Sequence, residues 1–160
     1  MKSNIKVAAR LRGDITIIKT DVATGRETLY SVRNTITYDG FNSALFGWAQ
    51  DGVTANDFRI TELVVGTNGT PPTHGDVGCY APVVPATIAL AAPNRNVSTS
   101  TGELIITATL PQVSPANGST LREVALMLGN GACFARQVHP DMAKSIAFTL
   151  TYIWNIAITA

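Results

Sequence analysis

The sequence predicts a mainly β protein, an antiparallel β-sandwich or jelly roll with one short helix. The C-terminal segment alternates large apolar residues with small or neutral ones from Ile146 to Thr159, which is the period of a β-strand. Short segments of strand character recur along the chain, separated by Gly, Pro and Asn turn signals at intervals of about ten residues. This spacing favours a sandwich over alternating βαβ units.

The N-terminal segment of the sequence predicts a hairpin. Strands are expected at 5–11 and 15–20, and Thr24-Gly25 offers the positive φ angle that a hairpin turn needs. Residues 1–33 hold seven basic and three acidic residues, against five basic and eight acidic in the remainder. We therefore expect residues 1–33 to form a basic N-terminal hairpin or arm.

After Asp39, a residue type that caps helix starts, the apolar residues recur with the period of a helix. Its apolar residues at i, i+3, i+4 and i+7 are Phe41, Ala44, Leu45 and Trp48. The pattern predicts one short helix near 40–50.

The rest of the chain predicts β-structure. Strands are expected at 58–65, 95–100, 103–110, 121–128, 132–138 and 146–159. The glycines and prolines of GTNGTPPTHGDVG, residues 66–78, cannot sit in a strand ladder, so this segment is expected to be an exposed loop. Further turns are expected in PANGS and at Gly129-Asn130-Gly131.

The last strand has two contrasting faces. Its even positions, including Tyr152 and Trp154, are large and predict a core face. Its odd positions, including Thr149, Thr151 and Asn155, carry no charge, although a solvated strand face usually does. We expect another copy of the protein, another partner or the domain itself to cover this face, because an uncovered long strand invites edge pairing.

Composition fits a single domain, 1–160. Hydrophobic residues make up 46% of the chain and charged residues 14%, so much of the surface is neutral Thr, Asn, Ser and Gly. The net charge of +1 argues against nucleic-acid binding, and no segment predicts a signal peptide or a membrane span. Whether Cys79 and Cys133 form a bridge stays open, although a cytosol would keep them reduced.

The sequence predicts no catalytic, cofactor or metal site, and hence no enzyme. His74 and His139 have no serine in a G-x-S-x-G elbow, and no spacing singles out a carboxylate pair. The pairs His74 with Cys79 and Cys133 with His139 are spaced too widely for typical structural zinc. Trp48, Tyr80, Tyr152 and Trp154 would be the candidates for stacking on a sugar in a carbohydrate-binding module. That reading is less favoured because Tyr152 and Trp154 are expected in the core.

Several motifs together resemble small virion structural proteins of tailed bacteriophages. They are VGTNGTPPT, LREVALMLGNGACFARQVHPDMAKS, the closing LTYIWNIAIT and the earlier DGFNSALFGW, and the resemblance spans residues 36–159. The positions that match the family pattern are Gly66, Gly69, Arg122, Glu123, Gly129, Gly131, Ala135, Arg136 and Lys144. Ala125 and His139-Pro140 depart from that pattern. The charged side chains among the matching residues are expected to pair across neighbouring strands.

The resemblance implies a non-enzymatic structural role in a virion, made in the host bacterial cytoplasm. We expect a capsid decoration, or cement, protein that assembles as a dimer or trimer and binds the major capsid protein. The alternative is a tail, baseplate or fibre component that contacts tail proteins. The predicted partner-binding residues are Lys2, Lys6, Arg10, Arg12, Thr149, Thr151 and Asn155.

Overall fold

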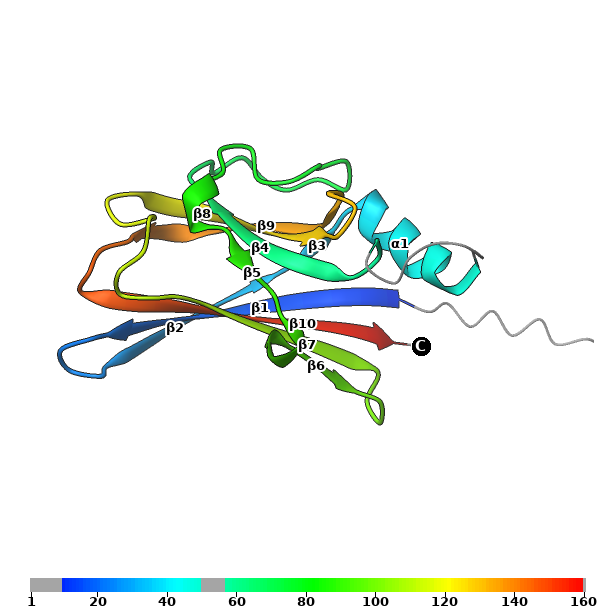
Figure 1. Cartoon of the computed structure of the whole chain (residues 1–160), viewed down its shortest axis with the longest axis horizontal. Coiled ribbons are helices and arrows are strands. Elements are labelled where there is room, and N and C mark those ends of the chain that lie inside the picture. Colours follow the sequence, from blue (N-terminus) through cyan, green and yellow to red (C-terminus); the bar gives the residue numbers. More distant parts are fainter. Residues whose placement is uncertain (1–9, 50–56, 160) are drawn as a thin grey trace, which may run out of the picture.

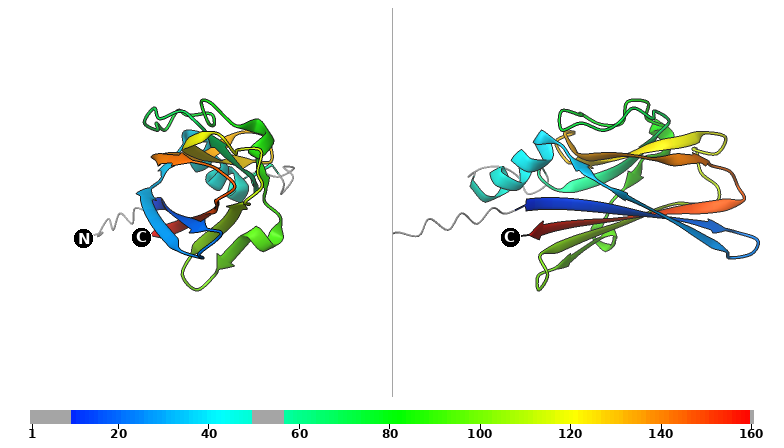
Figure 2. Two further views of the ribbon diagram at one scale, coloured as in Figure 1. Left: turned by 90° about the vertical axis from the view of Figure 1, so that its left-hand side faces the viewer. Right: turned by 180° about the vertical axis from the view of Figure 1, so that it is seen from behind.

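The computed structural model describes residues 10–49 and 57–159, and these form a two-layer antiparallel β-sandwich (Figure 1). One layer, sheet A, has the strand order β2-β1-β10-β7-β6, and the other, sheet B, has the order β3-β9-β8-β4-β5. Figure 2 shows the two sheets face to face, with the helix at one end of the molecule. The predicted fold class, a mainly β antiparallel sandwich with one short helix, is confirmed.

The elements have the following bounds. Sheet A contains β1 (Arg10–Asp21), β2 (Glu27–Arg33), β6 (Arg95–Ser98), β7 (Glu103–Leu110) and β10 (Phe148–Thr159). Sheet B contains β3 (Thr35–Ile36), β4 (Ile60–Gly66), β5 (Ile88–Ala89), β8 (Thr120–Leu128) and β9 (Cys133–Ala143). The helix is α1 (Tyr38–Ala49), and two short 3₁₀ turns are η1 (Val84–Ala86) and η2 (Ala92–Asn94).

The N-terminal hairpin is present, but its first strand is longer than expected. β1 runs without a break through Gly13. The prediction of separate strands at 5–11 and 15–20 is therefore wrong for residues 10–20. Residues 5–9 lie outside the described part of the chain. β1 and β2 pair from Asp14↔Arg33 to Thr20↔Glu27. Gly25 in the connecting turn has φ +69°, the conformation that glycine adopts without strain.

The last strand lies at the centre of sheet A. β10 pairs with β1 over its whole length, from Arg10↔Thr159 to Asp21↔Phe148, and with β7 on its other side. Its large side chains form the core face that the alternation predicts; the buried ones are Phe148, Leu150, Tyr152, Trp154 and Ile156. Ile146 precedes the strand and is 63% exposed, so its expected place on the core face is wrong.

Helix α1 begins two residues earlier than predicted, and Thr37 rather than Asp39 caps it. The Thr37 hydroxyl oxygen accepts the Gly40 N–H at 3.0 Å and the same hydroxyl donates to the Cys133 carbonyl, which ties the helix start to β9. A side chain at Gly40 would collide with the carbonyl of Phe134. Phe41 packs against the core, whereas the side chains expected on the helix face at Leu45 and Trp48 lie outside the described ones.

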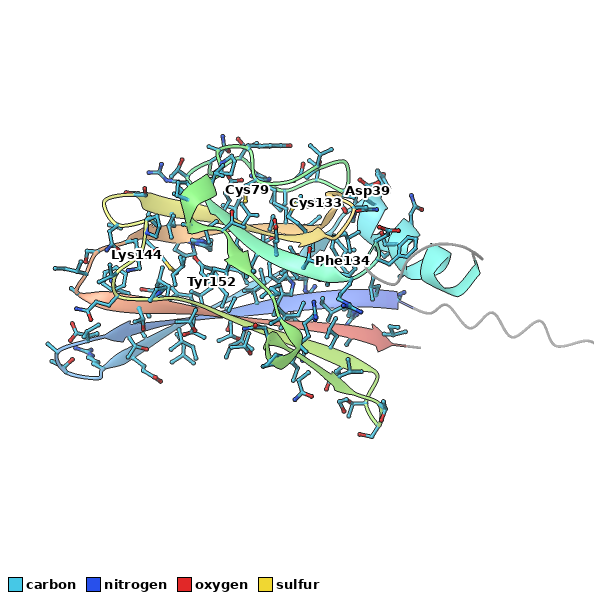
Figure 3. All side chains as sticks on the ribbon, viewed as in Figure 1. Asp39, Cys79, Cys133, Phe134, Lys144 and Tyr152 are labelled. Carbon is cyan, nitrogen blue, oxygen red and sulfur yellow. The ribbon has the colours of Figure 1, made fainter. Side chains whose placement is uncertain are left out.

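The core lies between the two sheets. Its largest fully buried apolar side chains come from both layers, for example Ile17 and Trp154 in sheet A with Leu63 and Leu126 in sheet B. In Figure 3 Tyr152 and Phe134 project into the space between the layers. Within the described residues, no helix is long and apolar enough to span a bilayer.

The alternation of β10 gives a stability prediction. Leu150→Ala removes a fully buried side chain and is expected to lower the free energy of unfolding by about 2–5 kcal/mol. Thr149→Ala, one residue away on the opposite face, is expected to change it by less than about 1 kcal/mol. Urea unfolding of both variants measures the difference, and equal losses would contradict the assignment of the two faces.

Candidate functional site

The outer face of sheet A is broad and largely uncharged. The register places two rows of neighbouring side chains across four strands of this face, Leu29-Ile18-Thr151-Thr109 and Ser31-Thr16-Ile153-Thr107. Leu29 is 62% exposed, and Ile18, Thr151 and Ile153 are half-buried. We call this surface, facing away from sheet B, the outer face of sheet A; among the described residues, no helix or further strand layer lies on it (Figures 1 and 2).

Several of the predicted partner-binding residues share this face. Thr149, Thr151 and Asn155 are half-buried on β10, and exposed Arg12 stands opposite Ala157 on the same side. Arg10 is exposed at the start of β1, while Lys2 and Lys6 lie outside the described residues. Edge pairing is not open to β10, because it is hydrogen-bonded to a strand on each side. What β10 presents is its face.

Sheet B is different, because the 66–82 segment lies over its outer surface and is tied there by a buried arginine (Figure 1). Arg136 on β9 is completely buried. Its guanidinium lies 2.7 Å from Glu123 on β8 and 2.9 Å from Asp76 in the loop, and it donates to the Thr70 carbonyl at 3.0 Å. One cation therefore joins two strands to two points of the loop.

Glu123 is the second anchor of the loop. Besides Arg136, its carboxylate accepts the backbone N–H groups of Asn68 at 3.3 Å, Tyr80 at 3.0 Å and Ala81 at 2.8 Å. The three donors come from both ends of the loop, so a single side chain closes it. Gly66 is required beside this carboxylate, since a Cβ there would lie 2.7 Å from the Ala81 carbonyl oxygen.

Asp76 is the loop's own carboxylate. It accepts hydrogen bonds from the Thr73 N–H at 3.0 Å, the Thr73 hydroxyl at 2.7 Å, the Tyr80 hydroxyl at 2.6 Å and Arg136 at 2.9 Å. Burial raises the pKa of Asp76, but these donors outweigh burial and lower it to about 2. The stability that this carboxylate contributes is present above pH 3.8 and is lost as the pH falls toward 2.

The aromatic ring of Tyr80 covers the cluster from outside. The Arg136 guanidinium carbon lies 4.2 Å from the ring centroid, so a cation–π contact adds to the hydrogen bonds. Every group of this Arg136 cluster, which we define as Arg136, Glu123, Asp76 and Tyr80, is bound by its neighbours. The arrangement can hold a loop rigidly, and it aims no reactive side chain into a cleft.

The expectation that charged residues pair across neighbouring strands is partly confirmed. Arg136 pairs with Glu123 across β9 and β8, and exposed Arg122 pairs with Asp141 at 2.9 Å. Lys144 instead binds no carboxylate in the described structure; its ammonium donates to the carbonyls of Gln112, Ser145 and Phe148 and to the side chain of Asn117. Burial lowers the pKa of Lys144. This lysine fixes the turns at that end of the sandwich (Figure 3).

The histidines and cysteines lie in separate structural settings. His74 donates its Nδ1–H to the Ile36 carbonyl at 2.6 Å and lies against the rings of Tyr38 and Phe41. Cys79 and Cys133 are free thiols whose pKa burial raises, to about 12 for Cys133. Across 10–49 and 57–159, no three His, Cys, Asp or Glu side chains gather closely enough to hold a metal ion.

His139 is buried between the sheets. Its Nδ1 lies 2.9 Å from the Pro140 carbonyl, its Nε2 has no hydrogen-bond partner among the described residues, and its ring centroid is 6.0 Å from that of Tyr152. Burial lowers the pKa of His139, although Asp141 and Glu123 act weakly in the opposite direction. Burial therefore disfavours the charged form of this imidazole.

Comparisons of the chain with protein-family models, curated proteins and solved structures found no match.

Sequence reasoning did not identify Asp76 as part of the cluster. The residue stands among turn formers in GTNGTPPTHGDVG, where aspartate ordinarily caps backbone amides. The exposed apolar residues Leu29, Val77 and Val84 were not singled out either, because isolated apolar positions carry no pattern. Fully buried charges opposite a loop carboxylate become recognisable only from tertiary contacts.

Arg136 tests the role of the cluster. Arg136→Met leaves two buried carboxylates without their cation and is expected to lower the free energy of unfolding by about 3–5 kcal/mol. Arg122→Met breaks an exposed pair and is expected to cost less than about 1 kcal/mol. Urea unfolding measures both variants, and limited proteolysis should cleave within 66–82 in Arg136→Met alone. Equal stability of the two variants would contradict an anchoring role.

The burial of His139 is expected to make the free energy of unfolding depend on pH. Because its folded pKa lies below the ordinary 6.5, the stability due to neutral His139 is complete above pH 6.5 and is lost as the pH falls below it. His139→Gln is expected to remove this loss, whose slope is at most about 1.4 kcal/mol per pH unit. Unfolding from about pH 7 to about pH 5 measures it. His74→Gln is the control and should keep the dependence; its loss in that variant would contradict the assignment to His139.

Proposed function

We propose that this chain is a non-enzymatic structural protein of a tailed-bacteriophage virion that decorates the assembled capsid. The observation that supports this most is the outer face of sheet A, whose centre is a surface of Thr, Ser and Ile. Extended surfaces with an uncharged centre suit contact with other protein. The resemblance of residues 36–159 to small virion proteins supports the same assignment.

The polar network of sheet B agrees with a structural role. In the resemblance, Gly66, Glu123 and Arg136 are matching positions, and in the fold these three residues meet around one loop. Their contacts stabilise a conformation and leave no side chain poised to attack a substrate. We therefore assign these matching residues a structural role, which is to hold the loop on sheet B.

Decoration acts through binding energy alone. A protein that binds the assembled shell and not its separated subunits stabilises the shell by about 2.7 kcal/mol per site at a concentration one hundred times its Kd. A dimer or trimer multiplies such contacts and suits the twofold and threefold axes of a capsid lattice. No covalent step is needed.

Carbohydrate binding has less support. Tyr152 and Trp154 are fully buried, as the alternation predicts, and cannot stack on a sugar. Tyr80 is 48% exposed, but one face of its ring lies on Arg136. The side chain of Trp48 lies outside the described ones.

Copy number and position in purified particles test the proposal. We expect hundreds of copies on the outside of the capsid, counted by quantitative mass spectrometry and placed by density. About three to twelve copies at one end of the particle would assign the chain to the tail instead, and its absence from particles would overturn the proposal.

Substitution on the outer face of sheet A gives a second readout. Ile153→Lys places a charge among neutral neighbours and is expected to weaken rebinding to stripped particles at least about tenfold. Ser100→Lys, in the exposed turn between β6 and β7, is the matched control and should bind as the unmodified protein does. Equal binding of both variants would exclude this face from the contact.

A further inference from the structure

The chain leaves an open position in sheet A where it crosses to sheet B. β2 pairs with β1 as far as Arg33, and the Asn34 N–H donates to the Gly13 carbonyl at 2.8 Å. The next residues, Thr35 and Ile36, belong to β3 and pair with β9 in the other sheet. Figures 1 and 2 show this crossing from β2 to β3.

β1 continues past the crossing. Leu11 and Arg12 still pair with Ile158 and Ala157 of β10 on one side, but on the other side no strand of the described ranges continues the pairing of β2. An exposed strand edge of this kind offers backbone N–H and C=O groups to an incoming chain. We call this site the β1 notch; it is a cavity of about 200 Å³ lined by Leu11, Arg12, Gly13, Asp14, Arg33 and Asn34.

The side chain of Asn34 has unused hydrogen-bonding capacity at this site. Both its Nδ2 and its Oδ1 are buried and find no partner within residues 10–49 and 57–159. Leaving a buried polar group unpaired is unfavourable, so such a group calls for a missing partner. A primary amide needs an acceptor and a donor together, and a backbone peptide unit supplies both, whereas a simple anion would satisfy Nδ2 alone.

The charges around the β1 notch indicate what side chains the incoming segment carries. Arg12 and Arg33 are exposed among its lining residues, and Asp14, the one acid among them, stands opposite Arg33 in the β1–β2 register. Guanidinium groups recognise carboxylates with directed hydrogen bonds. An extended segment with an acidic residue therefore fits both the strand edge and the flanking charges.

We propose that the β1 notch binds an extended acidic peptide segment of a partner protein, which adds beside Leu11–Gly13 as a short further strand. Main-chain hydrogen bonds to β1 and to the Asn34 amide hold the segment, and Arg12 and Arg33 select its acidic side chains. The inference rests on the proposed function only for the identity of the partner, which would be a neighbouring virion protein.

Nuclear magnetic resonance of the full chain tests this inference with a synthetic eight-residue peptide of alternating Glu and Val. We expect saturable shifts of the Asn34 side-chain amide and of the Leu11 and Gly13 backbone amides. The double variant Arg12→Glu, Arg33→Glu is expected to bind the peptide at least about tenfold more weakly. Arg26→Glu, an exposed arginine in the β1–β2 turn, is the matched control and should bind normally.

Three outcomes would overturn the inference. One is an equally strong response to a Lys-Val peptide, which would remove the role of the arginines. A second is the same set of shifts with sodium glutamate alone, which would reduce the notch to an anion site. The third is an Asn34 side-chain amide whose signal does not shift at saturating peptide, which would mean that the peptide does not reach this amide.

The outcomes remain separate from those of the proposed function. Peptide binding at the notch together with absence of the chain from particles would retain the inference and reject the virion role. A chain found on capsids that fails to bind the acidic peptide would do the opposite.

Discussion

The described structure of sheet B depends on one buried cation. Arg136 stands where two strands and a glycine-rich loop meet, and each of its bonds replaces water that burial has removed. Without it, Glu123 and Asp76 would be two like charges in a site closed to solvent, and the loop would lose its anchors at Asp76 and Thr70. The same contacts set the difference between the two layers: sheet B is covered by its own chain, and sheet A shows a face to its surroundings.

The strand pattern was predictable because alternation is a local property. β7 lies at 103–110, as the sequence indicates, and the core face of β10 follows from the side chains of Phe148 to Ile156. The start of the helix was placed less well, since the capping group, Thr37, is also selected by a bond to β9. Such long-range partners leave no trace in spacing.

The candidate sites were predictable only in part. The outer face containing Thr149 and Thr151 followed from composition, whereas its position in the middle of a sheet followed from the strand order, which sequence does not fix. The β1 notch depends on β2 leaving sheet A at Asn34, a consequence of the packing of β3 against β9. Polar residues beside a strand end look like an ordinary turn until the topology is known.

The position of β10 also has a consequence for biosynthesis. The strand that joins the β1–β2 hairpin to β7 and β6 follows all four of them in the sequence, so the two halves of sheet A have no common neighbour until β10 has been synthesised. Contacts between the two ends of a chain are slow to form because a long loop must close first. Sheet A can therefore be completed only once β10 is present, and a chain truncated before Phe148 would leave the β1–β2 and β6–β7 hairpins without the strand that joins them.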